Sequence, residues 1–369
     1  MRKMIFLVNR LNEGGAQKII AFLASACQKR GDSVYIISME YGDITVNLNE
    51  NITVFFLNGK DRPKKIFLKK LLFDIHLILQ IRKIYQQIHP DIICSFLPYI
   101  STLAYLASIN LGYIYKIVSE RENPYSLSKT KKFIYTWIYS KYDYIVFQTS
   151  KAKEYFPINI QNKSMVIPNP CIPRDKVIAP YTGEREDIII AAGRLEKIKG
   201  FQDLIKAFYF VTKHNPELTL KIYGEGSERN NLEKLIVKYN LEEKIQLVGS
   251  VKDVFKIERK AKAFVLTSYG EGIPNVLMEA LAVGLPCIAT DCNPGGPRLL
   301  LANGNRGELV RVGDIEALAH SICKVVNDSN LSNKYSQNAV EVIEEFSPDR
   351  ILKQWFLIFS FSKKSRKQM

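Results

Sequence analysis

Two glutamates stand eight positions apart in a stretch whose other residues are mostly apolar or glycine. Glu271 belongs to a Gly/Glu/Pro loop after an apolar strand, and Glu279 lies on a short helix expected between Pro274 and Gly284. Proline at a helix start and glycine just past its end are the usual boundaries. A carboxylate on such an apolar helix is costly to bury without partners, and a helix N-terminus offers N–H groups to an anion. The pair therefore suits a ligand with both hydroxyl groups and a diphosphate, such as a nucleotide sugar.

A second charged element lies upstream, where the strand at Ile188–Ala192 enters a loop with Arg194 and Lys199 ahead of a helix. Arginine supplies a planar fork and lysine a point charge, and together they suit a diphosphate. Two solvated surface cations would look the same in isolation, since most charged side chains are exposed. The two carboxylates in the same half of the chain favour the anion pocket.

These motifs carry a resemblance to a known family. The stretch from Glu271 to Pro286, continued by Ala289–Arg298, resembles the signature of the retaining GT-B glycosyltransferases of family 4. Gly193–Gly200 matches the G-R-x-x-x-x-K-G element of that family residue by residue. The alternative is an ordinary strand-loop-helix unit with one salt-bridged glutamate, and motif together with context argues against it.

The resemblance implies roles for individual residues. Glu271, Arg194 and Lys199 are the expected catalytic residues, with Glu271 beside the sugar hydroxyls and the two cations on the diphosphate. Glu279 is expected to bind the ribose hydroxyls. The expected donor-binding set is Gly15, Arg194, Lys199, Gly224, Glu271, Gly272, Ile273, Pro274, Asn275 and Glu279.

Three residues are expected on the acceptor side: Gly14, Glu120 and Arg121. Gly14 and Gly15 form a glycine-rich loop after the first strand, where backbone N–H groups can approach a ligand, although a plain strand-helix turn fits nearly as well. Glu120 and Arg121 follow a strand, at a place where many family members have a histidine. The alternative there is an exposed loop ended by Pro124.

For the donor-side residue Gly224 the alternative is a tight turn, because the third glycine of a dinucleotide fingerprint is absent.

Alternation of apolar strands with helical stretches predicts an α/β protein with two doubly wound, Rossmann-like domains, the GT-B architecture, in which a cleft lies between them. We expect an acceptor-binding domain at 1–178, a donor-binding domain at 179–345, and a crossover helix with a basic tail at 346–369. The linker is placed near Pro173–Glu186. The predicted helices of the second half are Phe201–Lys213, Glu228–Tyr239, Val254–Ala261, Val276–Val283 and Ile315–Val326, followed by a last helix at Ile351–Phe359 and a frayed end at Lys363–Lys367.

Composition narrows the function further. No apolar run reaches the roughly 20 residues of a spanning helix. The six cysteines lack a C-x-x-C spacing and are expected to be reduced packing residues of a cytosolic protein. No Asp-x-Asp or histidine pattern predicts a metal site, so we expect metal-independent transfer without a cofactor.

The net charge of +15 is uneven. Residues 1–180 hold 25 Lys and Arg against 13 Asp and Glu, whereas the remainder holds 27 against 24. Basic-aromatic clusters at Lys60–Lys70 and Lys129–Tyr142 suggest an anionic membrane surface. We therefore expect a peripheral protein on the cytoplasmic face of the inner membrane. It would transfer a hexose or N-acetylhexosamine from a UDP-sugar to a lipid-linked saccharide, such as one on undecaprenyl diphosphate, during surface polysaccharide synthesis.

Two other functions stay open. A nucleotide-sugar 2-epimerase or a phosphorylase would keep the fold and change the reaction. A nucleic-acid-binding protein would explain the pI of about 9.3, but no recognised binding module accompanies the charge. The sequence predicts neither the donor sugar nor the oligomeric state.

Overall fold

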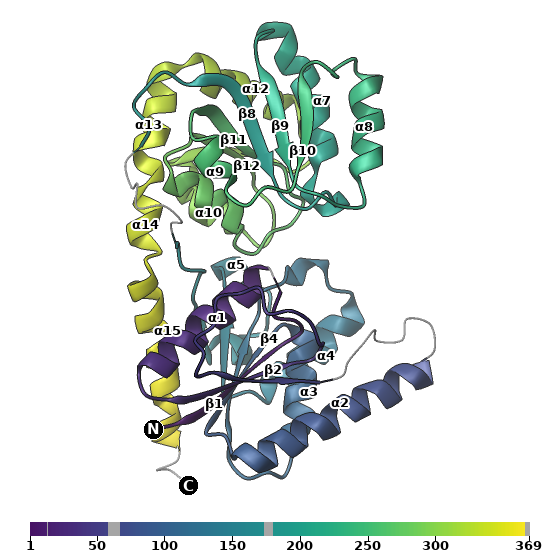
Figure 1. The fold of residues 1–369 in the computed structure, drawn as a ribbon, viewed down its shortest axis with the longest axis vertical. Helices are drawn as coiled ribbons and strands as arrows, with labels where there is room; N and C mark the ends of the chain where they lie inside the picture. The colour runs from purple at the N-terminus through teal and green to yellow at the C-terminus, as the bar shows by residue number, and fades with distance from the viewer. Residues whose placement is uncertain (13, 58–66, 173–179, 366–369) are drawn as a thin grey trace. The chain divides into compact units, whose positions relative to one another are not determined.

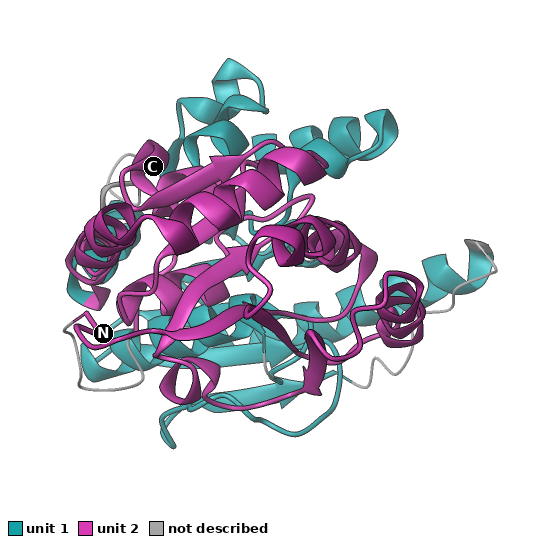
Figure 2. Ribbon diagram, turned by 90° about the horizontal axis from the view of Figure 1, so that it is seen from above, with its two compact units in different colours: residues 1–168, 349–369 teal, residues 169–348 magenta. Residues whose placement is uncertain are grey.

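The computed structural model describes residues 1–12, 14–57, 67–172 and 180–365. They form two compact units, which Figure 2 colours separately. Unit 1 comprises residues 1–168 and 349–369, and unit 2 comprises residues 169–348. Each unit is built on a parallel sheet with helices on both faces, which confirms the predicted α/β class.

Unit 1 contains a seven-stranded sheet in the order β3-β2-β1-β4-β5-β6-β7. Every strand pair is parallel. The strands are β1 (Lys3–Val8), β2 (Ser33–Ser38), β3 (Thr53–Phe56), β4 (Ile92–Phe96), β5 (Tyr115–Ser119), β6 (Tyr144–Phe147) and β7 (Ser164–Val166).

The side chains of β1 alternate between the two helical layers of unit 1, because successive side chains of a strand point to opposite faces of the sheet. Met4, Phe6 and Val8 pack against α1 (Gly15–Lys29) and α15 (Pro348–Ser365). Ile5 and Leu7 pack against α2 (Phe67–Ile88) and α3 (Pro98–Ser108). The remaining helices are η1 (Pro124–Ser126), α4 (Lys129–Ser140), α5 (Ser150–Glu154) and α6 (Ile158–Gln161).

The last helix belongs to unit 1 although its sequence follows unit 2. Figure 1 shows α15 in yellow beside α1 in purple. Trp355 and Phe359 are fully buried, and the Arg30 guanidinium at the end of α1 lies 4.6 Å from the ring centre of Phe356. The crossover helix predicted from sequence is thus present.

Unit 2 contains a six-stranded parallel sheet in the order β10-β9-β8-β11-β12-β13. Its strands are β8 (Glu186–Ala192), β9 (Thr219–Tyr223), β10 (Ile245–Gly249), β11 (Ala261–Leu266), β12 (Cys287–Thr290) and β13 (Gly307–Val310). The strand order reverses between β8 and β11. Open α/β sheets bind ligands at such a switch point.

Helices again cover both faces of this sheet. Ile189 and Ala191 face α7 (Phe201–His214), α8 (Arg229–Lys238) and α12 (Ile315–Asn327), whereas Ile190 and Ala192 face α9 (Val254–Ile257) and α10 (Asn275–Ala282). The shorter or peripheral helices are η2 (Lys197–Lys199), α11 (Gly296–Leu300), η3 (Ala302–Gly304), α13 (Ser329–Ala339) and α14 (Glu341–Glu345).

Several predicted boundaries differ from the structure. The helix predicted at Val254–Ala261 ends at Ile257, because Ala261 already pairs with Glu186 in the sheet. The last helix is longer than Ile351–Phe359 and runs from Pro348 to Ser365, so the prediction of a frayed end is wrong for residues 363–365. Residues 366–369 lie outside the described residues.

The boundaries between the two units also differ from the predicted domain boundaries. Unit 1 ends at Pro168 rather than at residue 178, and unit 2 runs to Pro348 rather than to 345. The reason is a backbone hydrogen bond from the Cys171 N–H to the Phe346 carbonyl (2.8 Å), which ties the segment after Pro168 to unit 2. Residues 173–179 of the predicted linker lie outside the described part of the chain.

Candidate active site

The loops after β8 and β11 are held together at the switch point of unit 2. The Tyr269 N–H donates to the Ile198 carbonyl (2.8 Å), and the Thr267 hydroxyl donates to the Lys199 carbonyl (3.0 Å). Gly200 has φ of 66°, and a Cβ there would lie 2.1 Å from the Thr267 carbonyl oxygen. Only glycine therefore permits this close approach.

This packing brings together two of the residues predicted from sequence. The Lys199 ammonium forms a short ion pair with Oε1 of Glu271, and both side chains are largely buried, at 18% and 14% exposed. The Ser268 hydroxyl donates to the same carboxylate oxygen (2.8 Å), and the Glu271 N–H donates to the Asn293 carbonyl (3.0 Å). The Glu271 carboxylate is therefore fixed in position by its own backbone and by two side chains.

Arg194 lies on the same loop as Lys199 but points elsewhere. Its side chain is 74% exposed, and its guanidinium bonds the Glu196 carboxylate (2.7 Å). An exposed ion pair of this kind contributes little to stability. Arg194 can therefore exchange Glu196 for an anionic ligand at small cost, whereas Lys199 is already held beside Glu271.

Gly224 supports the loop rather than forming part of a dinucleotide fingerprint. Its φ is 137°, and a Cβ there would lie 1.9 Å from the Gly193 carbonyl oxygen. The Gly193 N–H in turn donates to the Tyr223 carbonyl (2.9 Å). Gly224 thus allows the end of β9 to pack directly against the loop that carries Arg194 and Lys199.

Gly272, Ile273, Pro274 and Asn275 lead from Glu271 into the N-terminus of α10, as predicted. The Gly272 carbonyl oxygen would lie 1.5 Å from a Cβ on Gly296, so this turn packs tightly on the start of α11. Ile273 and Pro274 are buried. The first turn of a helix has N–H groups without intrahelical acceptors, and here that turn follows Glu271 closely.

Sequence reasoning missed a partner at this helix end. The buried Asn169 side chain donates from Nδ2 to Oδ1 of Asn275 (2.7 Å). Glu279 lies one turn further along α10, half-buried. Burial, and next the nearby Glu279 charge, raise the pKa of the Cys171 thiol to about 12. Glu279 therefore lies within electrostatic range of the Cys171 thiol.

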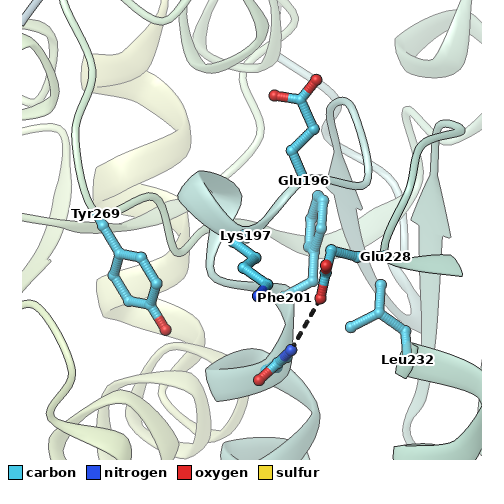
Figure 3. A pocket seen from close by; sticks show the side chains of 7 residues that line it. Glu196, Lys197, Phe201, Glu228, Leu232 and Tyr269 are labelled. Atoms are coloured by element: carbon cyan, nitrogen blue, oxygen red, sulfur yellow. Dashed lines mark hydrogen bonds between the residues drawn. The ribbon is translucent and has the colours of Figure 1, made fainter. Parts of the chain in front are cut away.

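A pocket of about 240 Å³ adjoins the same loop. Figure 3 shows Phe201 near its centre, Tyr269 on one side, and Glu228 with Leu232 on the other. The buried Glu228 carboxylate accepts from the Gln202 amide (3.1 Å). The lining residues are Glu196, Lys197, Phe201, Gln202, Glu228, Leu232 and Tyr269. No sequence motif indicated this pocket, which is smaller than most ligand sites.

In unit 1, Gly14 and Gly15 begin α1 after β1. Gly14 has φ of 171°, which is extended backbone open to any residue. A Cβ there would meet only the end of the flexible Gln17 side chain. The fold therefore does not itself require glycine at position 14. Glu13, between this loop and the strand, lies outside the described residues.

Glu120 follows β5 and is buried, so the alternative of an exposed loop is wrong for this residue. Its carboxylate accepts a short hydrogen bond from the Tyr139 hydroxyl of α4 and another from the Glu122 N–H (2.8 Å). Burial raises the pKa of Glu120 to about 7, although these hydrogen bonds oppose the rise. Tyr139 covers the carboxyl, which local sequence could not indicate.

Arg121 packs on the opposite face of β5. Its guanidinium lies 5.5 Å from the ring centre of Phe96 and 5.9 Å from that of Trp355 on α15, and its Nε donates to the Ser119 hydroxyl (2.7 Å). Burial lowers the pKa of Arg121 to about 10. The residue thus connects the end of β5 with the crossover helix.

The described residues contain neither a metal-site cluster nor a membrane-spanning helix. Within them, no group of three or more His, Cys, Asp or Glu side chains is placed to hold a metal ion. Likewise, none of the described helices is both long and apolar enough to cross a bilayer. All six cysteines are free thiols, five buried and Cys323 half-buried.

Comparison with known proteins identifies the class of enzyme that has this fold and these loop motifs. The model of "Glycosyltransferase Family 4" matches residues 13–173, and that of "Glycosyl transferases group 1" matches residues 176–342. Together they cover most of the chain, which belongs to this family of GT-B glycosyltransferases.

A bacterial relative is similar to this chain over nearly its full length. A Campylobacter jejuni protein is 27% identical over 362 residues, covering 98% of this chain and 99% of the relative. Its name is GalNAc-alpha-(1->4)-GalNAc-alpha-(1->3)-diNAcBac-PP-undecaprenol alpha-1,4-N-acetyl-D-galactosaminyltransferase.

Solved structures share the fold. Sucrose-phosphate synthase from Thermosynechococcus elongatus superposes with a TM-score of 0.85 at 16% identity, covering 99% of this chain and 100% of that one. Anabaena HepE in complex with UDP and glucose has a TM-score of 0.79 at 18% identity, with 98% and 100% covered.

Proposed function

We propose that this glycosyltransferase moves one hexose or N-acetylhexosamine from a UDP-sugar to a lipid-linked saccharide, with retention of the anomeric configuration. The observation that carries the proposal is the Lys199–Glu271 pair, held between the loops after β8 and β11. These loops follow the two strands at which the strand order of unit 2 reverses. A ligand of an open parallel sheet is expected there.

Most of the proposed donor-binding residues belong to unit 2. Glu271 would accept hydrogen bonds from sugar hydroxyls, since its carboxylate is oriented by Ser268 and Lys199. Glu279 would accept from the ribose hydroxyls. A UDP donor is supported by the Anabaena structure of the same fold, which holds UDP and glucose.

Departure of UDP places negative charge on the diphosphate, and the same loops offer positive charge to it. Lys199 is fixed beside Glu271, and Arg194 can swing from its exposed Glu196 partner. The first turn of α10 follows Glu271 and has N–H groups without intrahelical acceptors. Such preorganised charge can stabilise a leaving group without a metal ion. We therefore propose metal-independent transfer.

The acceptor is proposed by analogy with the Campylobacter relative, whose name describes a saccharide on undecaprenyl diphosphate. Such a lipid-linked precursor would serve surface polysaccharide synthesis. A membrane-linked acceptor agrees with the basic first half of the chain and with α4, where Phe133 and Trp137 are exposed among lysines. We place the protein peripherally on the cytoplasmic face of the inner membrane. Residues 60–66 of the other basic cluster lie outside the described residues.

The alternative reactions have less support. The four histidines lie on α2 (His76), directly after it (His89), at the end of α7 (His214) and on α12 (His320). None belongs to the loops after β8 or β11, where a 2-epimerase would need acid-base groups. Nucleic-acid binding has no support beyond the net charge.

A UDP-release assay tests the proposal. Purified protein is incubated with UDP-glucose, UDP-galactose, UDP-GlcNAc or UDP-GalNAc, with and without bacterial lipid-linked saccharides. We expect release with one donor class, strong stimulation by the lipid fraction, and no effect of EDTA. Loss of activity with EDTA and recovery with Mn²⁺ would contradict metal independence. Conversion of UDP-GlcNAc to its epimer without an acceptor would favour the epimerase.

A further inference from the structure

One face of helix α2 is apolar and exposed, which is unusual for a helix that also packs on a sheet. Five aliphatic side chains share this face: Leu68 (61% exposed), Leu71 (44%), Leu72 (58%), Ile75 (43%) and Leu79 (60%). At 100° per residue they fall within an arc of about 100°, along about 17 Å of helix. No described residue covers this apolar face. Exposed apolar patches of this kind mark interaction surfaces.

The opposite face of α2 accounts for its attachment to unit 1. Leu77, Ile81 and Tyr85 are buried against the sheet and α3. The Tyr99 hydroxyl of α3 donates to the Asp74 carboxylate (2.6 Å). The apolar face is therefore not needed to hold α2 in place, and Figure 1 shows the N-terminal end of α2 extending past α3 and α4.

Charge on α2 indicates what the apolar face meets. Lys69, His76 and Lys83 are exposed and seven residues apart, so they form one row along an edge of the face. Asp74 is the acidic residue of α2, and it is turned toward α3. A second copy of this chain would bring the same two lysines, Lys69 and Lys83, without a matching acidic row. An anionic surface with an apolar interior complements both features.

We propose that the α2 face, defined as Leu68, Leu71, Leu72, Ile75 and Leu79, inserts into the interface of a bilayer that contains anionic lipids. Lys69 and Lys83 then lie at the level of the lipid headgroups. The inference rests on the proposed peripheral location and adds the element that produces it. Membrane binding is then expected to depend on apolar insertion as well as on electrostatic attraction.

The first test uses the full-length protein and vesicles of phosphatidylethanolamine with phosphatidylglycerol. The variant L72Q/I75Q/L79Q keeps the net charge and changes only exposed positions, so it is expected to fold. We expect its vesicle affinity to fall at least about tenfold, since three aliphatic side chains lose burial. The matched control V237Q/I257Q alters two equally exposed aliphatic residues of unit 2 and is expected to bind like wild type.

The second test places a reporter on the face. A tryptophan at position 72 (L72W) is expected to shift its emission to the blue on vesicle binding and to be quenched by brominated lipid, relative to wild type. A tryptophan at position 237 (V237W) is expected to do neither. The charge variant K69Q/K83Q should lose about fivefold in affinity per lysine on phosphatidylglycerol vesicles and change little on phosphatidylcholine vesicles.

Several outcomes would overturn the inference. One is wild-type-like vesicle binding by L72Q/I75Q/L79Q, and another is no vesicle binding by wild type. A third is a wild-type dimer in analytical ultracentrifugation that the triple substitution converts to monomer while vesicle binding is unchanged. A thermal shift with UDP must be equal in all variants, which confirms an intact unit 2. If vesicle binding follows the expectation but no lipid-linked saccharide is glycosylated, the inserted face stands and the proposed acceptor fails.

Discussion

Lys199 and Glu271 form a short ion pair although 72 residues separate them in the chain. The contact exists because β8 and β11 are neighbours in the sheet, so the loops that follow them meet at one edge. Gly200 allows the loops to approach, and the Thr267 hydroxyl and the Tyr269 N–H hold them together by donating to the Lys199 and Ile198 carbonyls. A cation and a carboxylate held in this way offer groups to a diphosphate and to sugar hydroxyls within one site.

The first prediction concerns the cation of this pair. Lys199→Met should lower kcat by about a hundredfold or more, because it removes charge stabilisation of the leaving diphosphate. Lys206→Met is the matched control, since Lys206 lies on α7 and its ion pair with Asp203 (3.9 Å) does not involve Glu271. Steady-state UDP release measures both. Equal kcat values for wild type and folded Lys199→Met would remove Lys199 from the reaction.

Glu279 is expected to act in binding rather than in the chemical step. Glu279→Ala should raise the donor KM about tenfold or more, because hydroxyl groups of the donor lose a charged acceptor. Its kcat should change less than that of Lys199→Met. Glu316→Ala, an exposed glutamate at the start of α12, is the control. An unchanged donor KM would contradict the ribose assignment.

Glu120 makes stability depend on pH. Its pKa is about 7 in the folded protein against an ordinary value of 4.5, because burial disfavours the charged form. The folded state therefore binds the Glu120 proton more tightly than the unfolded state does. The stabilisation that protonated Glu120 contributes is fully present below about pH 4.5 and is lost as pH rises through about 7. The loss is roughly 3 kcal/mol.

Glu120→Gln should flatten this part of the pH profile, since the amide cannot ionise. Urea unfolding of both proteins between pH 4.5 and 8 measures the difference. The neighbouring Tyr139 and Arg121 are present in both, so the comparison isolates the carboxyl. Parallel profiles would show that Glu120 does not titrate in this window.

Gly224 is predicted to affect the site through packing. Gly224→Ala would place a Cβ 1.9 Å from the Gly193 carbonyl oxygen, at a φ of 137°. We expect a loss of about 2 kcal/mol or more in stability, together with weaker UDP binding. Gly313→Ala is the control, because its φ is also positive but its Cβ would meet no atom within 4 Å. Equal melting temperatures for the two variants would contradict the close approach.

Sequence reasoning predicted the parts of the site that depend on local pattern. The loops of Arg194–Lys199 and Glu271–Asn275 follow strands with clear apolar runs, and the helix after Pro274 begins and ends where its proline and glycine indicate. Parallel strands place such loops at one sheet edge. The pair Lys199–Glu271 could therefore be expected to lie together.

Contacts between distant segments could not be predicted in this way. The Asn169–Asn275 hydrogen bond spans 106 residues, and the Tyr139 cover of Glu120 depends on how α4 packs. Strand β13 has no clear sequence signal, because it is short and begins with Gly307, where a Cβ would lie 2.2 Å from the Cys287 carbonyl oxygen. Here tertiary packing decides the residue type, and local propensity gives no signal.

The most direct test of the central claim is analysis of the product. Lipid-linked saccharide is incubated with the protein and the UDP-sugar that supports UDP release, and the glycan is examined by mass spectrometry and by the NMR coupling of its new anomeric proton. The account predicts one added hexose or N-acetylhexosamine in the same anomeric configuration as in the donor. An inverted linkage would contradict retention, and an unmodified lipid-linked saccharide would contradict the proposed transfer itself.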